Sequence, residues 1–269
     1  MNAPQAPAQL EPLLLEARSP EGIVTLTLNR PAQFNSLSEE MLAALQAAFD
    51  RIGADTAARV IVIAAAGKAF CAGHDLKQMK SNPRQEYYEK LFADCARLML
   101  TIQRVPQPVI ARIHGIATAA GCQLVATCDL AVAAEGTRFG VNGIDVGLFC
   151  SSPSVALARN VGRKQAFEML VTGEFIDAAT AKARGLVNRV VPADQLDDEV
   201  KRLAEAIVAK PGVAIGMGKG LFYRQLEMGV DAAYQLAGQT MACNMINDVA
   251  QEGVAAFMEK RKPHWSGSR

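Results

Sequence analysis

The chain has 269 residues, a formal net charge of +1, and hydrophobic side chains at 50% of its positions. This length suits one large domain or two small ones with a sizeable core. The balanced charge gives no case for nucleic acid or a membrane surface as a partner. The six cysteines form no CxxC pair, so we expect reduced core residues and not a zinc site or a disulfide framework. No apolar run reaches the roughly 18 residues of a membrane span, and the first residues lack a secretion or transit signal, which predicts a cytoplasmic protein.

Strands and helices alternate through the first two thirds of the chain, as the period of the apolar residues shows. The predicted strands are 13–17, 23–28, 60–63, 109–113 and 130–134, and the first two flank the turn SPEG as a hairpin. The predicted helices are 38–52, 87–104 and 153–160. This repeated strand-then-helix order indicates an α/β fold.

The pattern becomes entirely helical after residue 191. Helices are predicted over 193–210, 212–227, 230–247 and 248–260. We therefore expect a short lead-in at 1–12, a core over 13–200, and a helical oligomerisation region over 201–269.

Small residues fill the stretch from Gly115 to Asp129, which reads GIATAAGCQLVATCD. It predicts a strand end, a turn and a helix that opens at 119–121, where small side chains let a ligand approach the backbone. A helix N-terminus offers free N–H groups and a positive dipole end, which suit a developing oxyanion. Gln123 lies half a turn further, and its amide cannot exchange protons at neutral pH. The stretch therefore predicts a binding site that lacks its obvious acid or base.

A second turn of the same kind follows the apolar run at 60–63. Ala72 and Gly73 form a tight loop, and Asp75 has the chemistry of a helix N-cap. The N–H of His74 is then free at a strand-to-helix turn. Two such turns can direct two backbone donors at one oxygen atom.

Four segments resemble the crotonase superfamily, also called the enoyl-CoA hydratase/isomerase superfamily. They are LTLNRPAQFNSL, AFCAGHDLKQM, GIATAAGCQLVATCD and FMEKRKPHW, and they match in order from about residue 13 to the C-terminus. The segment GIDVGLFCSSPSVALARNVGRK at 143–164 is most similar to one branch of the superfamily. The resemblance implies a crotonase-like spiral of ββα repeats with a helical C-terminal trimerisation region.

By the same resemblance, the ligand is an acyl-CoA thioester whose carbonyl accepts hydrogen bonds from the N–H groups of His74 and Ala120. Alanine replaces the family's usual glycine at 120 but still donates. CoA enters as part of the substrate, with no tightly bound cofactor and no metal. A homotrimer or a dimer of trimers is implied, in which Phe257 and Lys260 reach the adenine end of CoA in a neighbouring subunit. The residues placed along CoA within one subunit are Lys68, Ala72, Leu76 and Lys77.

The two glutamates of the family's hydratases fall on Gln123 and Gly143 here, so both are lost. Hydration of a 2-enoyl thioester needs a base for water and an acid for C2, and losing one such group costs about 10²–10⁴ in rate. We therefore expect little hydration by the usual route. Restoring both glutamates should gain more than the product of the two single changes, unless Gly143 has a positive φ.

Two other residues are candidates for proton transfer. His74 could titrate at the mouth of the pocket, or its ring could point to solvent while only its backbone acts, and we favour the second interpretation. Asp145 could supply a displaced carboxylate, or it could cap a turn or pair with an arginine. Structural roles are predicted for His114 and Asp129, and a helix-cap role is favoured over a nucleophile for the rim formed by Cys150, Ser151 and Ser152.

Two functions from different classes stay open. The first is an enzyme that acts on an acyl-CoA thioester as a lyase or isomerase, with His74 or Asp145 as the displaced proton-transfer group. The second is a CoA-thioester-binding protein with little catalysis, acting as a sink or a sensor. The loss of both glutamates favours the second function, and the small-residue turns fit either.

Overall fold

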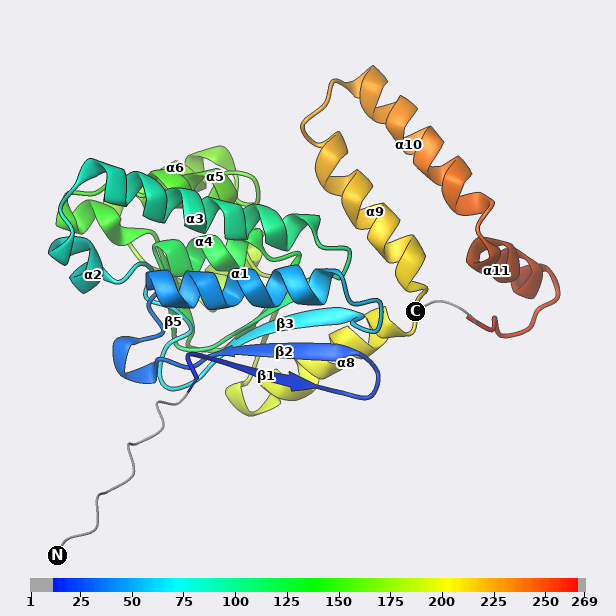
Figure 1. The fold of residues 1–269 in the computed structure, drawn as a ribbon, viewed down its shortest axis with the longest axis horizontal. Coiled ribbons are helices and arrows are strands. Elements are labelled where there is room, and N and C mark those ends of the chain that lie inside the picture. Colours follow the sequence, from blue (N-terminus) through cyan, green and yellow to red (C-terminus); the bar gives the residue numbers. More distant parts are fainter. Residues whose placement is uncertain (1–11, 266–269) are drawn as a thin grey trace, which may run out of the picture.

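The computed structural model describes residues 12–265, which form an α/β core and a helical tail (Figure 1). The predicted lead-in at 1–12 therefore lies outside the described residues except for its last position. None of the helices in the described part is long and apolar enough to cross a membrane.

Two sheets organise the core. The larger has the strand order β1–β2–β3–β4–β6–β9. Its strands are β1 (Leu14–Arg18), β2 (Ile23–Leu28), β3 (Val60–Ala65), β4 (Val109–Ile113), β6 (Leu130–Ala134) and β9 (Arg189–Val191). The predicted hairpin of β1 and β2 is antiparallel, and the other neighbours are parallel. The smaller sheet has the order β5–β7–β8, with β5 (Ile116–Thr118), β7 (Arg138–Gly140) and β8 (Ile176–Asp177).

Strand β3 is buried on both faces, as its unbroken apolar sequence requires. On one face, Ile61 and Ile63 join the main core with the helices α1 (Glu39–Gly53), α3 (Gln85–Arg104) and α4 (Ala120–Thr127). On the other face, Val60 and Val62 pack with the helix α8 (Leu196–Val208). Helices thus cover both sides of the parallel strands (Figure 1).

The boundary expected at residue 200 falls inside α8. Leu196, Val200 and Leu203 belong to one buried cluster with the strands of the large sheet. Because α8 closes a face of that sheet, the whole helix belongs to the core. The helical tail begins after it, near Pro211.

The remaining helices are short and connect the layers. They are α2 (Leu76–Ser81), α5 (Ser151–Leu157), α6 (Arg163–Thr172) and α7 (Ala178–Ala183), with 3₁₀ turns η1 (Pro31–Gln33), η2 (Asn142–Val146) and η3 (Ala193–Gln195). The helix predicted over 153–160 both begins and ends earlier than expected. Its first turn closes when the Ser154 N–H donates to Cys150 C=O at 2.9 Å, so Pro153 is the third helical residue and not the first.

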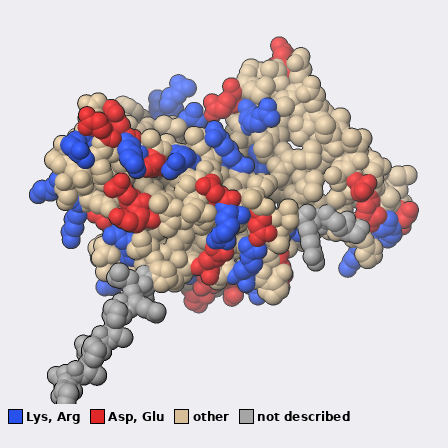
Figure 2. Space-filling model, in the orientation of Figure 1, with Lys and Arg blue, Asp and Glu red and all other residues tan. Residues whose placement is uncertain are grey.

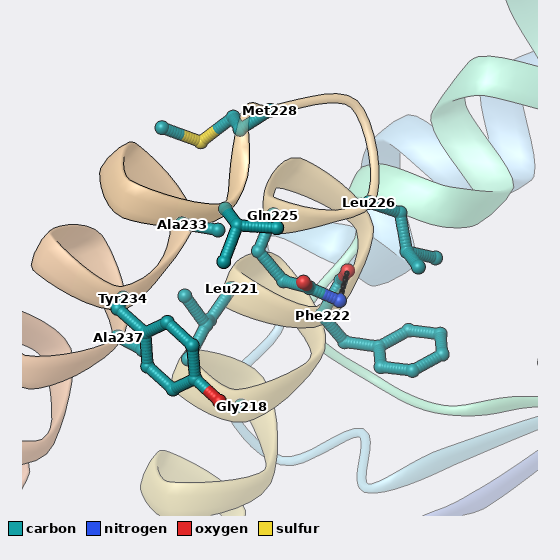
Figure 3. A pocket seen from close by; sticks show the side chains of 10 residues that line it. Gly218, Leu221, Phe222, Gln225, Leu226, Met228, Ala233, Tyr234 and Ala237 are labelled. Carbon is teal, nitrogen blue, oxygen red and sulfur yellow. Dashed lines mark hydrogen bonds between the residues drawn. The ribbon is translucent and has the colours of Figure 1, made fainter.

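The tail consists of α9 (Gly212–Gln225), α10 (Val230–Met245) and α11 (Asp248–Met258), which extend away from the sheet (Figure 1). Figure 2 shows few charged side chains over α10, whereas acidic and basic side chains gather at the end of the tail around α11. A hollow of about 680 Å³ lies between α9 and α10 (Figure 3). Large apolar side chains exposed on the tail include Phe222, Tyr234, Met241, Met245, Phe257 and Met258. Cys243 is also exposed here, unlike the five buried cysteines, so the expectation of a core residue is wrong at this position.

Candidate active site

The two strand-to-helix turns predicted from the sequence lie against each other. A Cβ added to Gly73 would lie 2.9 Å from Ala119 Cβ and 3.2 Å from the nitrogen of Ala120. A Cβ added to Gly121 would lie 2.2 Å from the carbonyl oxygen of Cys71. Glycine is needed at 73 and 121 because atoms of the opposite turn occupy the space of a side chain.

Both predicted donors are free within residues 12–265. The Leu37 N–H donates to Gly73 C=O at 2.7 Å, and the Asp75 N–H donates to Leu37 C=O at 3.3 Å. This pairing with Leu37 uses the groups on either side of His74 and not the His74 N–H, which donates to no group in the described chain. Ala120 is the first residue of α4, where no preceding carbonyl reaches the N–H.

Ala119 holds a strained backbone conformation directly before the second donor. Its φ of 50° and ψ of −121° lie in a region that a non-glycine residue occupies at a cost of about 1–3 kcal/mol. The Ala119 N–H donates to Gly140 C=O at 3.0 Å and helps to hold this conformation. The next peptide plane carries the Ala120 N–H, so the ψ angle of Ala119 sets the direction in which that donor points. Such outliers cluster at functional sites.

The first turn is held by Asn35, a residue that the sequence reasoning missed. Its side chain is fully buried, and Nδ2 donates to the carbonyls of Ala66 and Ala69, each at 2.8 Å. Its Oδ1 accepts from the Arg30 N–H at 2.8 Å. Asn35 also has a positive φ of 54°, which asparagine tolerates better than most residues. An asparagine within the matched segment LTLNRPAQFNSL was therefore the sequence signal that could have indicated this residue.

Asp75 caps α2 as predicted. Its Oδ1 accepts from the N–H groups of Lys77 at 3.1 Å and Gln78 at 3.4 Å. Arg30 Nη2 donates to Asp75 Oδ2 at 3.1 Å. Burial opposes ionisation, but hydrogen bonds from Gln78 N–H and Arg30 lower the pKa of Asp75. The ionised cap therefore fixes the start of α2 just after His74.

The imidazole of His74 does not point to solvent, which corrects the interpretation favoured from the sequence. Phe92 on α3 covers it edge-on with ring centroids 5.5 Å apart. The Nδ1 atom is buried and has no hydrogen-bond partner in the described chain. Burial lowers the pKa of His74 below its ordinary value of 6.5, although the Leu37 backbone acts in the opposite direction. The ring is therefore neutral at pH 7 and can accept a proton.

Gln123 lies three residues after Ala120 on the fully buried helix α4. Residues three apart share a helix face, so Gln123 stands on the same face of α4 as Ala120. The side chain is 5% exposed, and Oε1 has no hydrogen-bond partner in the described chain. An unpaired buried acceptor costs about 1–3 kcal/mol. Gln123 can therefore accept a hydrogen bond from a ligand but cannot supply a proton.

Gly143 stands in a closed turn that leaves no room for a side chain. Its N–H donates to Cys150 Sγ at 3.3 Å, and its carbonyl accepts from Leu148 N–H at 2.9 Å. An added Cβ would lie 2.4 Å from the Leu148 carbonyl oxygen and 2.8 Å from Cys150 Sγ. The φ of Gly143 is not positive, so the obstacle to a glutamate is steric and not the conformational strain considered from the sequence.

Asp145 is exposed in the same turn. Its Oδ1 lies 2.7 Å from the place where a Cβ on Gly173 would stand, just beyond the end of α6. The carboxylate is thus a solvated group beside a helix end. Of the two proton-transfer candidates, only His74, which is half-buried, carries a buried nitrogen without a partner in the described chain.

The residues expected along CoA fall into two separate groups. Lys68, Leu76 and Lys77 are exposed around the His74 turn, and Ala72 is half-buried there. Leu76 is 58% exposed although it is apolar, which leaves it open to a ligand. Phe257 is 84% exposed on α11. Helix α11 lies at the opposite end of the molecule from α2 (Figure 1), so neither Phe257 nor Lys260, which follows α11 by two residues, joins the site within one chain.

Structural roles are confirmed for His114 and Asp129. His114 pairs its Nε2 with Gly67 C=O at 2.8 Å, and Arg112 Nη1 lies 3.3 Å from its Nδ1. Asp129 binds three groups, as described below. The helix-cap role favoured for Cys150, Ser151 and Ser152 is wrong, because Cys150 precedes α5 without a side-chain cap hydrogen bond and the Ser151 hydroxyl instead donates to Phe149 C=O at 3.3 Å. No cluster of metal-binding side chains occurs within residues 12–265.

The chain is similar to known proteins in both sequence and fold. A family profile described as Enoyl-CoA hydratase/isomerase matches residues 18–268. The rat protein named Enoyl-CoA hydratase domain-containing protein 3, mitochondrial, is 42% identical over 265 residues, covering 98% of this chain and 88% of that protein. A crystal structure of enoyl-CoA hydratase from Mycobacterium smegmatis has a TM-score of 0.94 and 64% identity, and covers 95% of this chain and 100% of that chain.

The human enoyl Coenzyme A hydratase domain-containing protein 3 is also similar, with a TM-score of 0.91 and 42% identity over 94% of this chain and 100% of that chain. These similarities confirm the predicted crotonase-like fold, with its ββα repeats and C-terminal helices. They also confirm the branch indicated by residues 143–164, since this name recurs in both comparisons.

Proposed function

Because the chain belongs to the enoyl-CoA hydratase/isomerase family, we propose that it binds an acyl-CoA thioester at the paired turns and stabilises the enolate of that thioester. One observation carries this proposal: the N–H groups of His74 and Ala120 are both free where the two turns meet. One such donor is worth about 10²–10³ in kcat when charge develops on the oxygen.

Hydration by two carboxylates is not part of the proposal. Gln123 cannot exchange protons, and the turn at Gly143 is closed by Leu148 and Cys150. A proton removed from the carbon next to the thioester carbonyl would pass to His74, whose buried ring is neutral at pH 7. Asp145 is the second candidate because it is the carboxylate nearest in sequence to the lost glutamate. The reaction class would be that of a lyase or isomerase.

A second function is binding with little catalysis, as a sink or a sensor for acyl-CoA. The closed turn at Gly143 specifically favours this second function. The family's hydratases have their second glutamate at that position, whereas this chain has no ionisable side chain there. The same paired donors would then bind the thioester carbonyl without turnover.

A homotrimer or a dimer of trimers is proposed for the assembly. The tail exposes large apolar side chains, including Phe222, Met241 and Phe257, and exposed apolar surface of this extent usually marks an interface. In that assembly Phe257 and Lys260 would reach CoA bound to a neighbouring subunit. Light scattering at micromolar concentration tests this, and a monomer would contradict it.

We propose the cytoplasm, as predicted from the sequence, as the cellular location. The rat relative carries a mitochondrial name, so mitochondria are the alternative. Fractionation of cells that express the full chain separates the two.

The proposed function is tested by titrating the protein with butyryl-CoA in a calorimeter and screening an acyl-CoA panel for turnover by mass spectrometry. Binding with turnover of one acyl-CoA supports the enzyme, and binding without turnover across the panel supports the sink or sensor. Absence of binding to every acyl-CoA, in a protein whose melting curve shows it to be folded, would refute both.

A further inference from the structure

A lysine ammonium is buried where the tail meets the core. Lys219 on α9 is 9% exposed. Its Nζ donates to the carbonyls of Ile102 at 2.8 Å and Gln107 at 2.9 Å, and to Asp129 Oδ2 at 2.6 Å. An ammonium has three N–H donors, and all three are used. Because an unpaired buried charge is strongly unfavourable, this position of α9 is fixed relative to the core.

Asp129 links Lys219 to strand β4 and to the end of helix α4. Its Oδ2 also accepts from the Val109 N–H at 2.6 Å, at the start of β4. Its Oδ1 accepts from the Tyr223 hydroxyl on α9 at 2.7 Å. Asp129 follows the end of α4 by two residues. One carboxylate therefore ties the tail, the large sheet and the C-terminal end of α4 together.

Helix α4 connects this point to the candidate active site. It has eight residues, all of them buried, and its first residue is Ala120. A short helix enclosed on every side in a close-packed core moves as a unit. A displacement of Asp129 at one end of α4 therefore shifts the Ala120 N–H at the other end.

The tail beyond this point is largely uncovered in the single chain. Phe222, Leu226 and Tyr234 line the hollow between α9 and α10 (Figure 3). A second anchor holds the entry to α9, where Arg59 Nη2 donates to Lys210 C=O at 2.5 Å. A partner or a subunit that covers the hollow acts on α9, which is fixed to the core at these two places.

We propose that Asp129, Lys219 and Tyr223 form a coupling cluster through which the position of the tail sets the position of the Ala120 N–H. They are positioning residues that act through α4 and touch no substrate. The coupling itself does not depend on the proposed function, whereas its effect on acyl-CoA affinity rests on it.

Hydrogen exchange of the unliganded full-length protein tests the coupling. Tyr223→Phe removes one hydroxyl and keeps the Lys219–Asp129 pair, and Lys219→Met removes the charge. Glu227→Gln is the matched control, since it breaks an exposed link between the tail and Arg159. We expect faster exchange in residues 120–127 together with 212–225 in both cluster variants, more so in Lys219→Met, and in neither segment for the control.

Faster exchange confined to 212–225 in Tyr223→Phe would overturn the proposal, because the cluster would then anchor only the tail. Unchanged exchange in both segments would overturn it as well. If Lys219→Met unfolds, Tyr223→Phe alone decides. Butyryl-CoA affinity should fall about fivefold in Tyr223→Phe, or about 1 kcal/mol. If neither the wild type nor any variant binds butyryl-CoA or any other acyl-CoA of the panel, the proposed function fails while the exchange result still judges the coupling.

Discussion

The two sides of the candidate active site are built from different parts of the chain. The side proposed to bind the thioester carbonyl consists of backbone, with the N–H groups of His74 and Ala120 fixed by strands, caps and glycines. The side proposed for proton transfer depends on positions 123 and 143, where the resemblance places the two glutamates of hydratases, and neither Gln123 nor Gly143 is ionisable. Backbone groups come with the fold, whereas a single substitution changes a side chain. One scaffold can therefore retain thioester binding and lose a particular reaction.

The largest expected effect comes from removing a backbone donor. Ala120→Pro deletes the N–H, and proline is tolerated at the first position of a helix. Turnover of any acyl-CoA substrate found in the panel should fall about 10²–10³-fold, with weaker butyryl-CoA binding by calorimetry. Val230→Pro, at the first residue of α10, is the matched control and should change neither quantity. Unchanged binding and turnover in a folded Ala120→Pro protein would refute the assignment of the Ala120 N–H as a donor to the oxyanion.

The contact between the turns should be intolerant of a single methyl group. Gly121→Ala would place Cβ 2.2 Å from Cys71 C=O, and we expect a loss of about 3 kcal/mol in the free energy of unfolding. Gly220→Ala in α9, where an added Cβ meets nothing within 4 Å, should instead stabilise by about 0.5–1 kcal/mol. Urea unfolding measures both. Equal effects would show that the turns are not in contact.

Adding glutamates tests whether the side-chain side can be rebuilt. Gln123→Glu alone should leave crotonyl-CoA hydration near zero, as in wild type, because its partner is missing. Gly143→Glu should cost about 1–3 kcal/mol in stability, since the closed turn must open. The double variant gains hydration only if that turn opens without unfolding. Loss of the enoyl absorbance is the readout, after thermal melts. Brisk hydration by wild type would show that another residue already transfers the protons.

The buried imidazole predicts a pH dependence of stability. Folding lowers the pKa of His74 through burial, so the unfolded chain binds a proton at higher pH than the folded chain does. Stability should therefore be full above about pH 6.5 and decline as pH falls toward the lowered pKa. His74→Gln should flatten this decline. A decline that persists in His74→Gln would assign it to another group.

The smallest expected effect concerns the strained residue before the second donor. Ala119→Gly relieves about 1–3 kcal/mol of backbone strain but adds about 0.5–1 kcal/mol of chain entropy to the unfolded state. The net result should be a slight gain in melting temperature with somewhat weaker butyryl-CoA binding. A clear loss of stability would mean that the conformation of Ala119 is not strained.

The sequence predicted those features whose cause is local. Strands β4 and β6 have the predicted bounds 109–113 and 130–134, because short apolar runs between turn residues leave few alternatives. The cap at Asp75 and both free N–H groups also follow from short patterns. The turns at 73 and 121 could be placed near each other only through the family resemblance, since no local pattern reports their contact.

Features that depend on distant residues could not be predicted. The ring of His74 is covered by Phe92 from another helix. Lys219 finds its partners in carbonyl oxygens of Ile102 and Gln107, which lie 117 and 112 residues earlier in the chain. Such partners are backbone groups without any sequence signature. The closed turn at Gly143 was also missed although Leu148 and Cys150 lie close in sequence, because a backbone carbonyl that folds back has no sequence signature.

The central question is whether two backbone donors polarise a bound thioester carbonyl. The most direct measurement is the infrared stretching frequency of butyryl-CoA labelled with ¹³C at that carbonyl, compared between the free and the bound state. We predict a lower frequency on binding to wild type, a smaller decrease with Ala120→Pro, and the wild-type decrease with Gln123→Met. A bound carbonyl that absorbs at or above its frequency in water would contradict the assignment of His74 and Ala120 as its donors.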